Sequence, residues 1–128
     1  MPAPEPASEA FGFVVTGPGD PEPTNADAFR DDIAVGESVV EFWAARCATC
    51  RRIAPWLTQW ARESATGVRM FTLNVDEEIE AAVDAGVRVA PTLVRYRDGR
   101  EVERLEGAID RPALLAWLAS SPESLPNV

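Results

Sequence analysis

The chain has 128 residues, of which 46 % are hydrophobic, enough for one domain with its own core. Its formal net charge of −9 makes nucleic acid and anionic membranes unfavourable partners. It contains no His and two Cys, which excludes His-based nucleophilic catalysis and leaves a zinc site within one chain short of ligands. We therefore expect no metal site, and a metal shared between two chains is the alternative.

Neither a targeting signal nor a membrane span is evident in the sequence. The first residues have no basic segment and no apolar one, and no apolar run approaches the length of a span. We expect a cytoplasmic protein, with a mature form that has lost its signal as the alternative. The frequent Pro, Ser, Ala and Glu at both ends predict loosely ordered tails at 1–10 and 119–128 around one domain at 11–118.

The first predicted elements precede the cysteines. A short apolar run predicts an edge strand at 11–15, and the Gly and Pro content of 17–23 predicts a loop. The next stretch, 25–33, predicts a helix with Thr24 or Asn25 as its N-cap.

The central elements surround the cysteines. The run SVVEFWA at 38–44 is rich in β-formers and predicts a buried strand. A helix is predicted at 47–64, in which Pro55 should introduce a bend. Its apolar residues at helical spacing define the face expected to pack inward: Ile53, Leu57, Trp60 and Ala61.

The remaining elements form the second half of the chain. A buried strand is predicted at 68–74, and a short helix at 77–85 should be capped by Asp76 and end at Gly86. The dipeptide Asp98-Gly99 predicts a hairpin between strands at 92–97 and 101–105. A last helix should begin at Asp110, with Pro112 in its first turn. Its inward face would hold Leu114, Leu115 and Leu118.

The order of these elements is β-α-β-α-β-α-β-β-α. Alternation of strands and helices predicts a parallel core, and the hairpin adds an antiparallel edge. Such a sheet needs helices on both faces, because both faces are apolar. The predicted fold class is therefore α/β with a central mixed sheet.

Cys47 and Cys50 lie where a buried strand leads into a helix. Their three-residue separation places both thiols on one side of the first turn, close enough to form a disulfide. Free N–H groups and the helix dipole favour a thiolate there, and Arg46 and Arg51 act in the same direction. Cys47 is then suited to attack a disulfide, and Cys50 to resolve the mixed disulfide. A structural role is less favoured, because a bridge this short restrains the unfolded chain only a little.

Three segments carry a resemblance to the thioredoxin family. They are VVEFWAARCATCRRIAP at 39–55, VAPTLVRYRDG at 89–99 and Glu106-Gly107-Ala108. The resemblance covers roughly residues 24–118 and implies the thioredoxin fold. It implies that Cys47 is the nucleophile and Cys50 the resolving thiol.

The resemblance also implies a substrate surface around the thiols. Pro91 would be the family's cis proline, and Ala90 would offer backbone hydrogen bonds to an extended substrate. Trp43, Gly107 and Ala108 would complete a flat apolar surface, although a core position for Trp43 is also compatible with the sequence.

Glu41 is the carboxylate of most interest, because it lies within an apolar strand where burial should raise its pKa. The family usually has Asp here, which serves the resolving cysteine, so we expect Glu41 to transfer a proton. A Glu that reaches solvent or pairs with Arg is the alternative.

Several residues depart from the family pattern. Ala48 and Thr49 replace the usual Gly-Pro between the cysteines, and the added hydroxyl and N–H of Thr49 could bond a thiolate and make the pair more oxidising. Arg46 replaces a frequent Trp and could favour acidic substrates. Thr72 replaces a Lys near the buried acid, and Arg95 occupies a strand position that is usually apolar.

The expected function is reduction of protein disulfides by the Cys47/Cys50 pair, with no cofactor beyond its own redox-active disulfide. The implied partners are disulfide-containing proteins and a donor resembling thioredoxin reductase or another dithiol. An oxidant or isomerase is the first alternative, and a binding or redox-sensing module without turnover is the second.

Overall fold

The computed structural model describes residues 21–63 and 67–120. Its strands are β1 (Glu22–Pro23), β2 (Glu37–Trp43), β3 (Arg69–Asn74), β4 (Thr92–Arg97) and β5 (Arg100–Glu106). Its helices are α2 (Phe29–Asp32), α3 (Ala48–Glu63), α4 (Ile79–Asp84) and α5 (Arg111–Ala119). Among these residues, no helix is long and apolar enough to cross a membrane.

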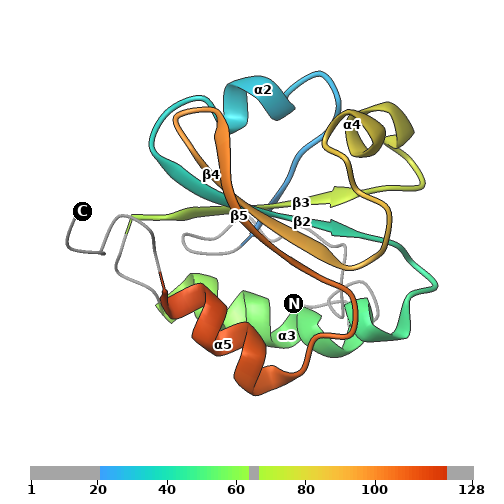
Figure 1. Ribbon diagram of the computed structural model, residues 1–128, viewed down its shortest axis with the longest axis vertical. Coiled ribbons are helices and arrows are strands. Elements are labelled where there is room, and N and C mark those ends of the chain that lie inside the picture. Colours follow the sequence, from blue (N-terminus) through green and yellow to red (C-terminus); the bar gives the residue numbers. More distant parts are fainter. Residues whose placement is uncertain (1–20, 64–66, 121–128) are drawn as a thin grey trace, which may run out of the picture.

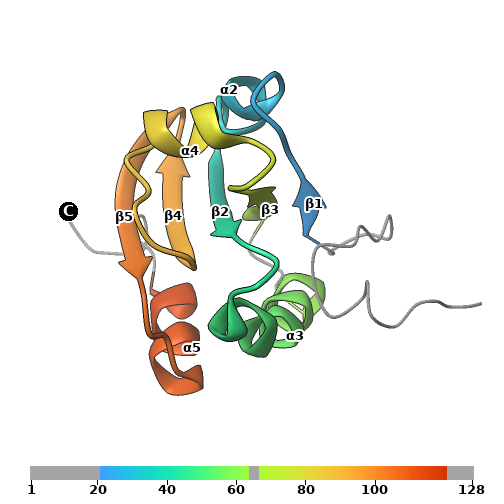
Figure 2. The same cartoon turned by 90° about the vertical axis from the view of Figure 1, so that its right-hand side faces the viewer.

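The described strands form one five-stranded sheet with the order β1-β3-β2-β4-β5, which Figure 2 shows from β1 on the right to β5 on the left. β1, β3 and β2 are parallel, whereas β4 is antiparallel to β2 and β5 is antiparallel to β4. Helices α2 and α4 cover one face and α3 and α5 the other (Figure 1). The predicted mixed sheet with helices on both faces is confirmed. The antiparallel pairing includes β2 with β4 as well as the predicted hairpin of β4 and β5.

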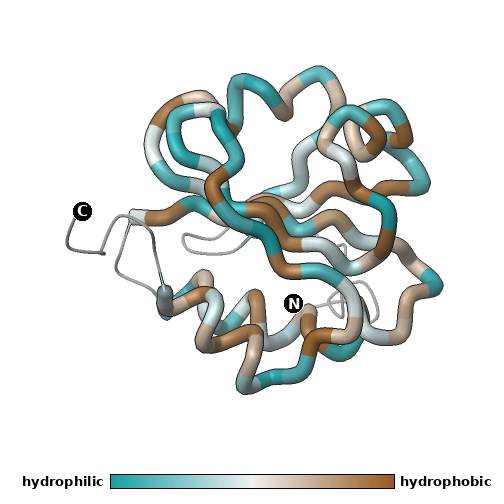
Figure 3. The backbone as a smooth tube through the Cα atoms, viewed as in Figure 1, coloured by the Kyte–Doolittle hydropathy of each residue, from teal (hydrophilic) through white to brown (hydrophobic). Residues whose placement is uncertain are grey.

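The core consists of two apolar layers on either side of the sheet, and Figure 3 shows hydrophobic stretches, interrupted by polar ones, along the strands between the two helical layers. One layer packs Ile33 and Ala81 against Phe42 and Phe71. The other packs α3 and α5 against the opposite side of the same strands. β2 is buried along six of its seven residues, because strands flank it and helices cover it. A loop that follows β2 therefore starts from a fixed position.

The N-terminal part differs from the prediction. The edge strand β1 lies at Glu22–Pro23, inside the predicted loop 17–23, and the strand predicted at 11–15 lies outside the described residues. Pro is tolerated here because an edge strand leaves one side of its backbone unpaired. The backbone N–H of Thr24 donates to Thr72 O at 2.7 Å and so extends the pairing with β3.

The helix predicted at 25–33 is shorter than expected. Only Phe29–Asp32 is α-helical, and Ala28 occupies its N-cap position. Asn25 instead stabilises the preceding turn, where its Oδ1 accepts from the N–H of Ala28 at 2.8 Å. Thr24 is not the cap either, since its hydroxyl donates to Asp32 at 2.6 Å.

The predicted Asp76 cap of α4 is also wrong. Asn74, the last residue of β3, accepts with Oδ1 from the N–H groups of Asp76 at 2.9 Å and Glu77 at 3.3 Å. The carbonyl of Asn74 also accepts from the N–H of Glu78 at 2.9 Å, one of the groups that an Asp76 cap would have served, and α4 begins only after Glu78. The helix ends before Gly86, at φ 74°, as predicted.

The C-terminal half follows the prediction closely. Asp98 and Gly99 both have positive φ, 51° and 87°, as a type I′ hairpin requires. Asp110 caps α5 by accepting from the N–H of Ala113 at 2.8 Å. Leu115 is the exception, because 36 % of it is exposed. It follows Leu114, which is fully buried, and neighbouring residues of a helix point in different directions.

Arg95 is the largest fully buried side chain. Its guanidinium pairs with Glu37 at 2.8 Å and Glu103 at 3.2 Å, and donates to the carbonyl of Trp117 at 2.6 Å. It also lies 4.5 Å from the centre of the Trp117 ring. Arg95 therefore joins β2, β4 and β5 to the C-terminal end of α5, where a cation also suits the helix dipole.

We expect Arg95→Leu to lower the free energy of unfolding by about 3 kcal/mol in urea titrations. The change leaves Glu37 and the Trp117 carbonyl without this partner in a buried position. Arg100→Gln, which removes an exposed Arg from the neighbouring strand, is the matched control and should change stability by less than about 0.5 kcal/mol. Similar stability of Arg95→Leu and the control would contradict this role.

Candidate active site

The thiol pair lies at the junction of β2 and α3. Cys47 immediately precedes the first helical residue, and its carbonyl accepts from the N–H of Arg51 at 3.1 Å. Its Sγ accepts from the N–H of Cys50 at 3.1 Å, so the sulfur takes the place of an N-cap oxygen. This N–H donor and the helix dipole both stabilise negative charge on the sulfur. Cys47 is half-buried, whereas Cys50 is buried, and both are free thiols.

The environment of Cys50 favours its protonated form. Burial raises the pKa of the Cys50 thiol well above its usual range, and a hydrogen bond to Cys47 raises it further. The backbone of Ala44 lowers it, while the charges of Glu41 and Cys47 raise it. The two sulfurs therefore differ in access and in environment, as a nucleophile and a resolving thiol must.

Two further loops reach the same point. The thiol of Cys47 donates to the carbonyl of Ala90 at 3.4 Å, and the Ala90–Pro91 bond is cis. The N–H of Gly107 donates to the carbonyl of Pro91 at 3.0 Å. Gly107 has φ 85°, which favours glycine at this contact. The three segments that resemble the family are thus contiguous in space.

The cysteine loop is held by arginines. Arg51 donates to the carbonyl of Ala45 at 2.8 Å, and Arg52 donates to the Thr49 hydroxyl at 3.2 Å. The backbone N–H that bonds the Cys47 sulfur is that of Cys50, not that of Thr49. In this structure the Thr49 hydroxyl therefore serves Arg52, and the expected bond from Thr49 to a thiolate is not formed.

Glu41 is 4 % exposed and lies on β2 between Thr72 of β3 and Leu93 of β4. Its Oε2 has no hydrogen-bond partner, and Thr72 offers no positive charge. Burial raises the pKa of Glu41 to about 8. An acid of this kind exchanges a proton near neutral pH, and its charge acts on Cys50.

The predicted surface residues differ in exposure. Trp43 is only 9 % exposed and packs mainly as a core aromatic. Arg46, Ala48 and Ala108 are exposed, and Gly107 is half-buried. The residues around the thiols thus form a rim that is partly charged.

The sequence analysis missed two contributors beside Pro91. Val89 is 43 % exposed and adds apolar surface next to Ala90. The Thr92 hydroxyl donates to the Val89 carbonyl at 2.6 Å and fixes that loop. Both residues lie in the segment 89–99. The resemblance of this segment to the family could have indicated that they lie beside the thiols. Among the described residues, no group of three or more potential ligands could hold a metal ion.

Comparison with known proteins agrees with this geometry. Residues 20–120 match the family model for thioredoxin. The chain is 36 % identical over 106 residues to thioredoxin of Mycobacterium tuberculosis (strain ATCC 25618 / H37Rv), covering 82 % of this chain and 89 % of the relative. It is 41 % identical over 81 residues to thioredoxin of Alicyclobacillus acidocaldarius subsp. acidocaldarius, covering 63 % of this chain and 77 % of the relative.

Solved structures show the same likeness. A mutant thioredoxin from Halobacterium salinarum NRC-1 superposes with a TM-score of 0.74 at 27 % identity, covering 88 % of this chain and 99 % of that one. A thioredoxin from Malassezia sympodialis superposes with a TM-score of 0.71 at 26 % identity, covering 84 % of this chain and 95 % of that one.

The fold and the thiol pair define a thiol–disulfide oxidoreductase. It is a protein-disulfide reductase that works through dithiol–disulfide exchange at Cys47 and Cys50. The chain belongs to the thioredoxin family.

Proposed function

We propose that Cys47 opens the reaction as the nucleophile. Its thiolate attacks one sulfur of a substrate disulfide, forming a mixed disulfide and expelling the other sulfur as a thiolate. Cys50 then loses its proton and attacks the Cys47 sulfur, which closes the Cys47–Cys50 disulfide and releases the second substrate thiolate. Two electrons pass to the substrate. The observation that supports this order is the 3.1 Å bond from the Cys50 N–H to the sulfur of the more exposed Cys47.

Glu41 is the proposed proton acceptor for Cys50. Its pKa of about 8 and the absence of a hydrogen-bond partner for its buried Oε2 leave it able to take a proton near neutral pH. The charge that it exerts on Cys50 indicates electrostatic coupling between the two groups. A carboxylate that relays a proton, directly or through water, would make Cys50 a competent nucleophile despite its burial.

The substrate lies against the three loops in this proposal. Ala90 offers backbone hydrogen bonds to an extended segment, and Pro91 packs beside the attacked sulfur. Ala48, Thr49, Gly107 and Ala108 form the surrounding surface, to which the mostly buried Trp43 adds only its small exposed part. Arg46 is exposed and forms no hydrogen bond or ion pair within the described residues, so it is available to an acidic side chain near the target disulfide.

The cycle requires a donor that reduces the Cys47–Cys50 disulfide again. We propose a flavin reductase resembling thioredoxin reductase, or another dithiol, acting in the cytoplasm. The disulfide itself carries the electrons, so the exchange needs no other cofactor. Equilibration with glutathione buffers separates a reductase from an oxidant: a reductase couple should be more reducing than glutathione.

Reduction of short disulfide peptides with dithiothreitol as donor tests the proposal. We expect turnover on all peptides, with an acidic peptide reduced about threefold faster than a basic one at low salt. Salt should remove the difference, and so should Arg46→Gln. Arg62→Gln, a change of the same kind near the other end of α3, is the control and should retain it. Absence of any turnover would contradict the reductase function, whereas equal rates would contradict only the role of Arg46.

A further inference from the structure

A cleft of about 400 Å³ lies between α2 and α4, over β4. It is on the face of the sheet opposite to α3, whose first turn carries the thiols (Figure 1). None of its lining residues takes part in the thiol exchange proposed above. Its volume is that of a site for a small molecule or a single side chain of a partner.

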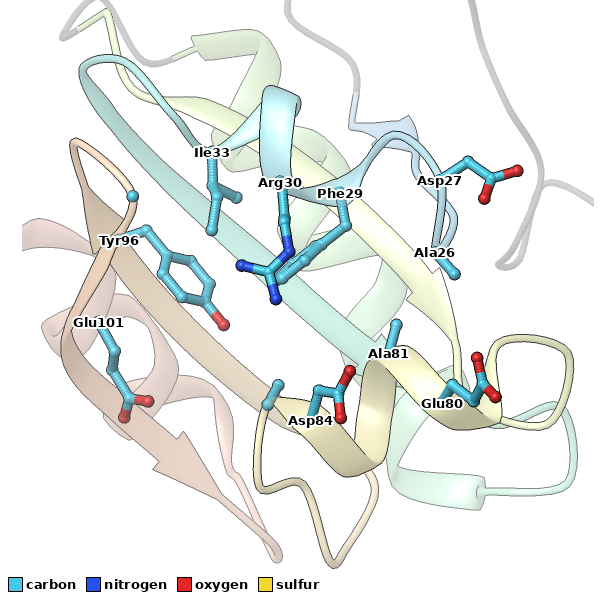
Figure 4. A pocket seen from close by; sticks show the side chains of 12 residues that line it. Ala26, Asp27, Phe29, Arg30, Ile33, Glu80, Ala81, Asp84, Tyr96 and Glu101 are labelled. Carbon is cyan, nitrogen blue, oxygen red and sulfur yellow. The ribbon is translucent and has the colours of Figure 1, made fainter.

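Tyr96 lines the inner wall of the cleft. The residue is 5 % exposed, and its hydroxyl has no hydrogen-bond partner among the described residues. Figure 4 shows that the hydroxyl projects into the space between α2 and α4. Burial, and then the charge of Glu101, raise the pKa of Tyr96 to about 12, while Arg104 lowers it. The phenol is therefore protonated at neutral pH and can both donate and accept a hydrogen bond.

The cleft is acidic. Its lining contributes one arginine, Arg30, and four carboxylates: Asp27, Glu80, Asp84 and Glu101. Glu101 is already engaged, because both of its oxygens accept from Arg104 at 2.7 Å. The other three carboxylates have no partner within the described part of the chain. The charge that remains uncompensated in the cleft is negative, which favours a cation.

Aromatic rings add a second feature that suits a cation. Phe29 and Tyr96 both line the cleft, and their ring centres are 5.6 Å apart in an edge-to-face arrangement. Aromatic faces attract ammonium and guanidinium groups and also accept an apolar stem. Figure 4 shows the side chain of Arg30 reaching across this space beside both rings. A guanidinium thus fits here, and this one is exposed and forms no ion pair or hydrogen bond within the described residues, so it can move aside.

We propose that this cleft binds a guanidinium or primary ammonium group carried on an apolar stem. The hydroxyl of Tyr96 would accept a hydrogen bond from the cation, the carboxylate of Asp84 would pair with it, and the two aromatic rings would contact the stem. A free polyamine and an Arg or Lys side chain of a partner protein present this same chemistry. Binding requires Arg30 to leave the cleft, so Arg30 competes with the ligand.

The test uses blocked amino acids with the full-length protein. N-acetyl-arginine methylamide should bind saturably and shift the amide resonances of Tyr96 and Gly99 in NMR titrations. The citrulline analogue, which has nearly the same shape and no charge, should bind at least about tenfold more weakly. Spermidine distinguishes the sources: tighter binding than the arginine probe indicates a free polyamine, and weaker binding indicates a partner's side chain.

Three variants test the contacts. Tyr96→Phe removes only the hydroxyl and should weaken binding several-fold, and Asp84→Asn should weaken it by a similar factor. Arg30→Gln should tighten it, because it removes the competing cation. Asp31→Asn changes an exposed carboxylate of α2 outside the cleft, and should have no effect. All four should reduce disulfide peptides at the normal rate, which separates this proposal from the one for the thiols.

Absence of saturable shifts at millimolar probe would overturn the proposal. Equal binding of the arginine and citrulline probes would also overturn it, because the charge would then not be recognised. So would an equal loss of affinity in Asp31→Asn and Asp84→Asn, because this result would indicate only general attraction to an acidic protein. Weaker binding of the arginine probe in Arg30→Gln would likewise overturn the proposal, because Arg30 would then contact the ligand and not compete with it.

Discussion

Cys50→Ser should stop the reaction at the mixed disulfide. The variant keeps Cys47 and the backbone N–H that bonds its sulfur, so attack on a substrate disulfide remains possible. It lacks the thiol that releases the product, and turnover should fall at least about a thousandfold. With Ellman's reagent, the variant should release one equivalent of thionitrobenzoate and keep the other as a stable adduct visible by mass spectrometry.

Cys47→Ser is the matched control for this experiment. It removes the more exposed sulfur and leaves Cys50 buried, with a pKa well above its usual range. We expect it to form no adduct on the time scale in which Cys50→Ser reacts fully. Rapid formation of an adduct by Cys47→Ser would show that the two roles are reversed, and would contradict the argument from burial.

Local signals explain why much of the site could be predicted from the sequence. The strand before Cys47, the spacing to Cys50 and the helix after them are all features of a short segment, and each depends on neighbouring residues alone. The same is true of the hairpin at Asp98-Gly99 and the cap at Asp110. Where a residue's own backbone preference decides its conformation, the sequence analysis was right.

The error at the first strand occurred where a distant partner decided the outcome. β1 exists because Glu22 and Pro23 pair with Phe71 and Thr72 of β3, which a loop-like composition does not indicate. The wrong cap of α4 had a local cause, because Asn74, two residues before Asp76, accepts with its carbonyl from the N–H of Glu78 that an Asp76 cap would have served.

Arg95 shows the same limit for burial. Its position in an apolar strand gave no reason for a charge, because its partners come from the start of β2, from β5 and from the end of α5. Only the assembled sheet and helix bring two carboxylates and a carbonyl to one guanidinium. Polar residues at buried positions are therefore explained by tertiary structure, not by local pattern.

Glu41→Gln should make the protein more stable than the wild type at high pH, and should make the resolving step slower. The pKa of Glu41 is raised from 4.5 to about 8, so the folded state holds this proton more tightly than the unfolded state. The stability that this provides is complete below pH 4.5 and is lost as the pH rises through 8. The wild type should thus lose up to about 5 kcal/mol between these pH values from this group, and Glu41→Gln should not. Urea titrations at pH 5 and pH 9 measure the difference.

The kinetic effect concerns the resolving step. If Glu41 accepts the proton of Cys50, release of the second thionitrobenzoate should rise in rate through pH 8 in the wild type. In Glu41→Gln this rise should disappear, and the rate at pH 8 should fall about tenfold or more. The first release, which depends on Cys47, should change much less.

A purely electrostatic role predicts the opposite kinetic result. The charge of Glu41 raises the pKa of Cys50, so removing that charge without a proton-transfer role would make the Cys50 thiolate easier to form and the second release faster. Glu77→Gln removes an exposed carboxylate in the turn that follows β3, the strand beside Glu41, and controls for general charge. Since proton transfer and electrostatics shift the second release in opposite directions, its rate in Glu41→Gln distinguishes the two roles.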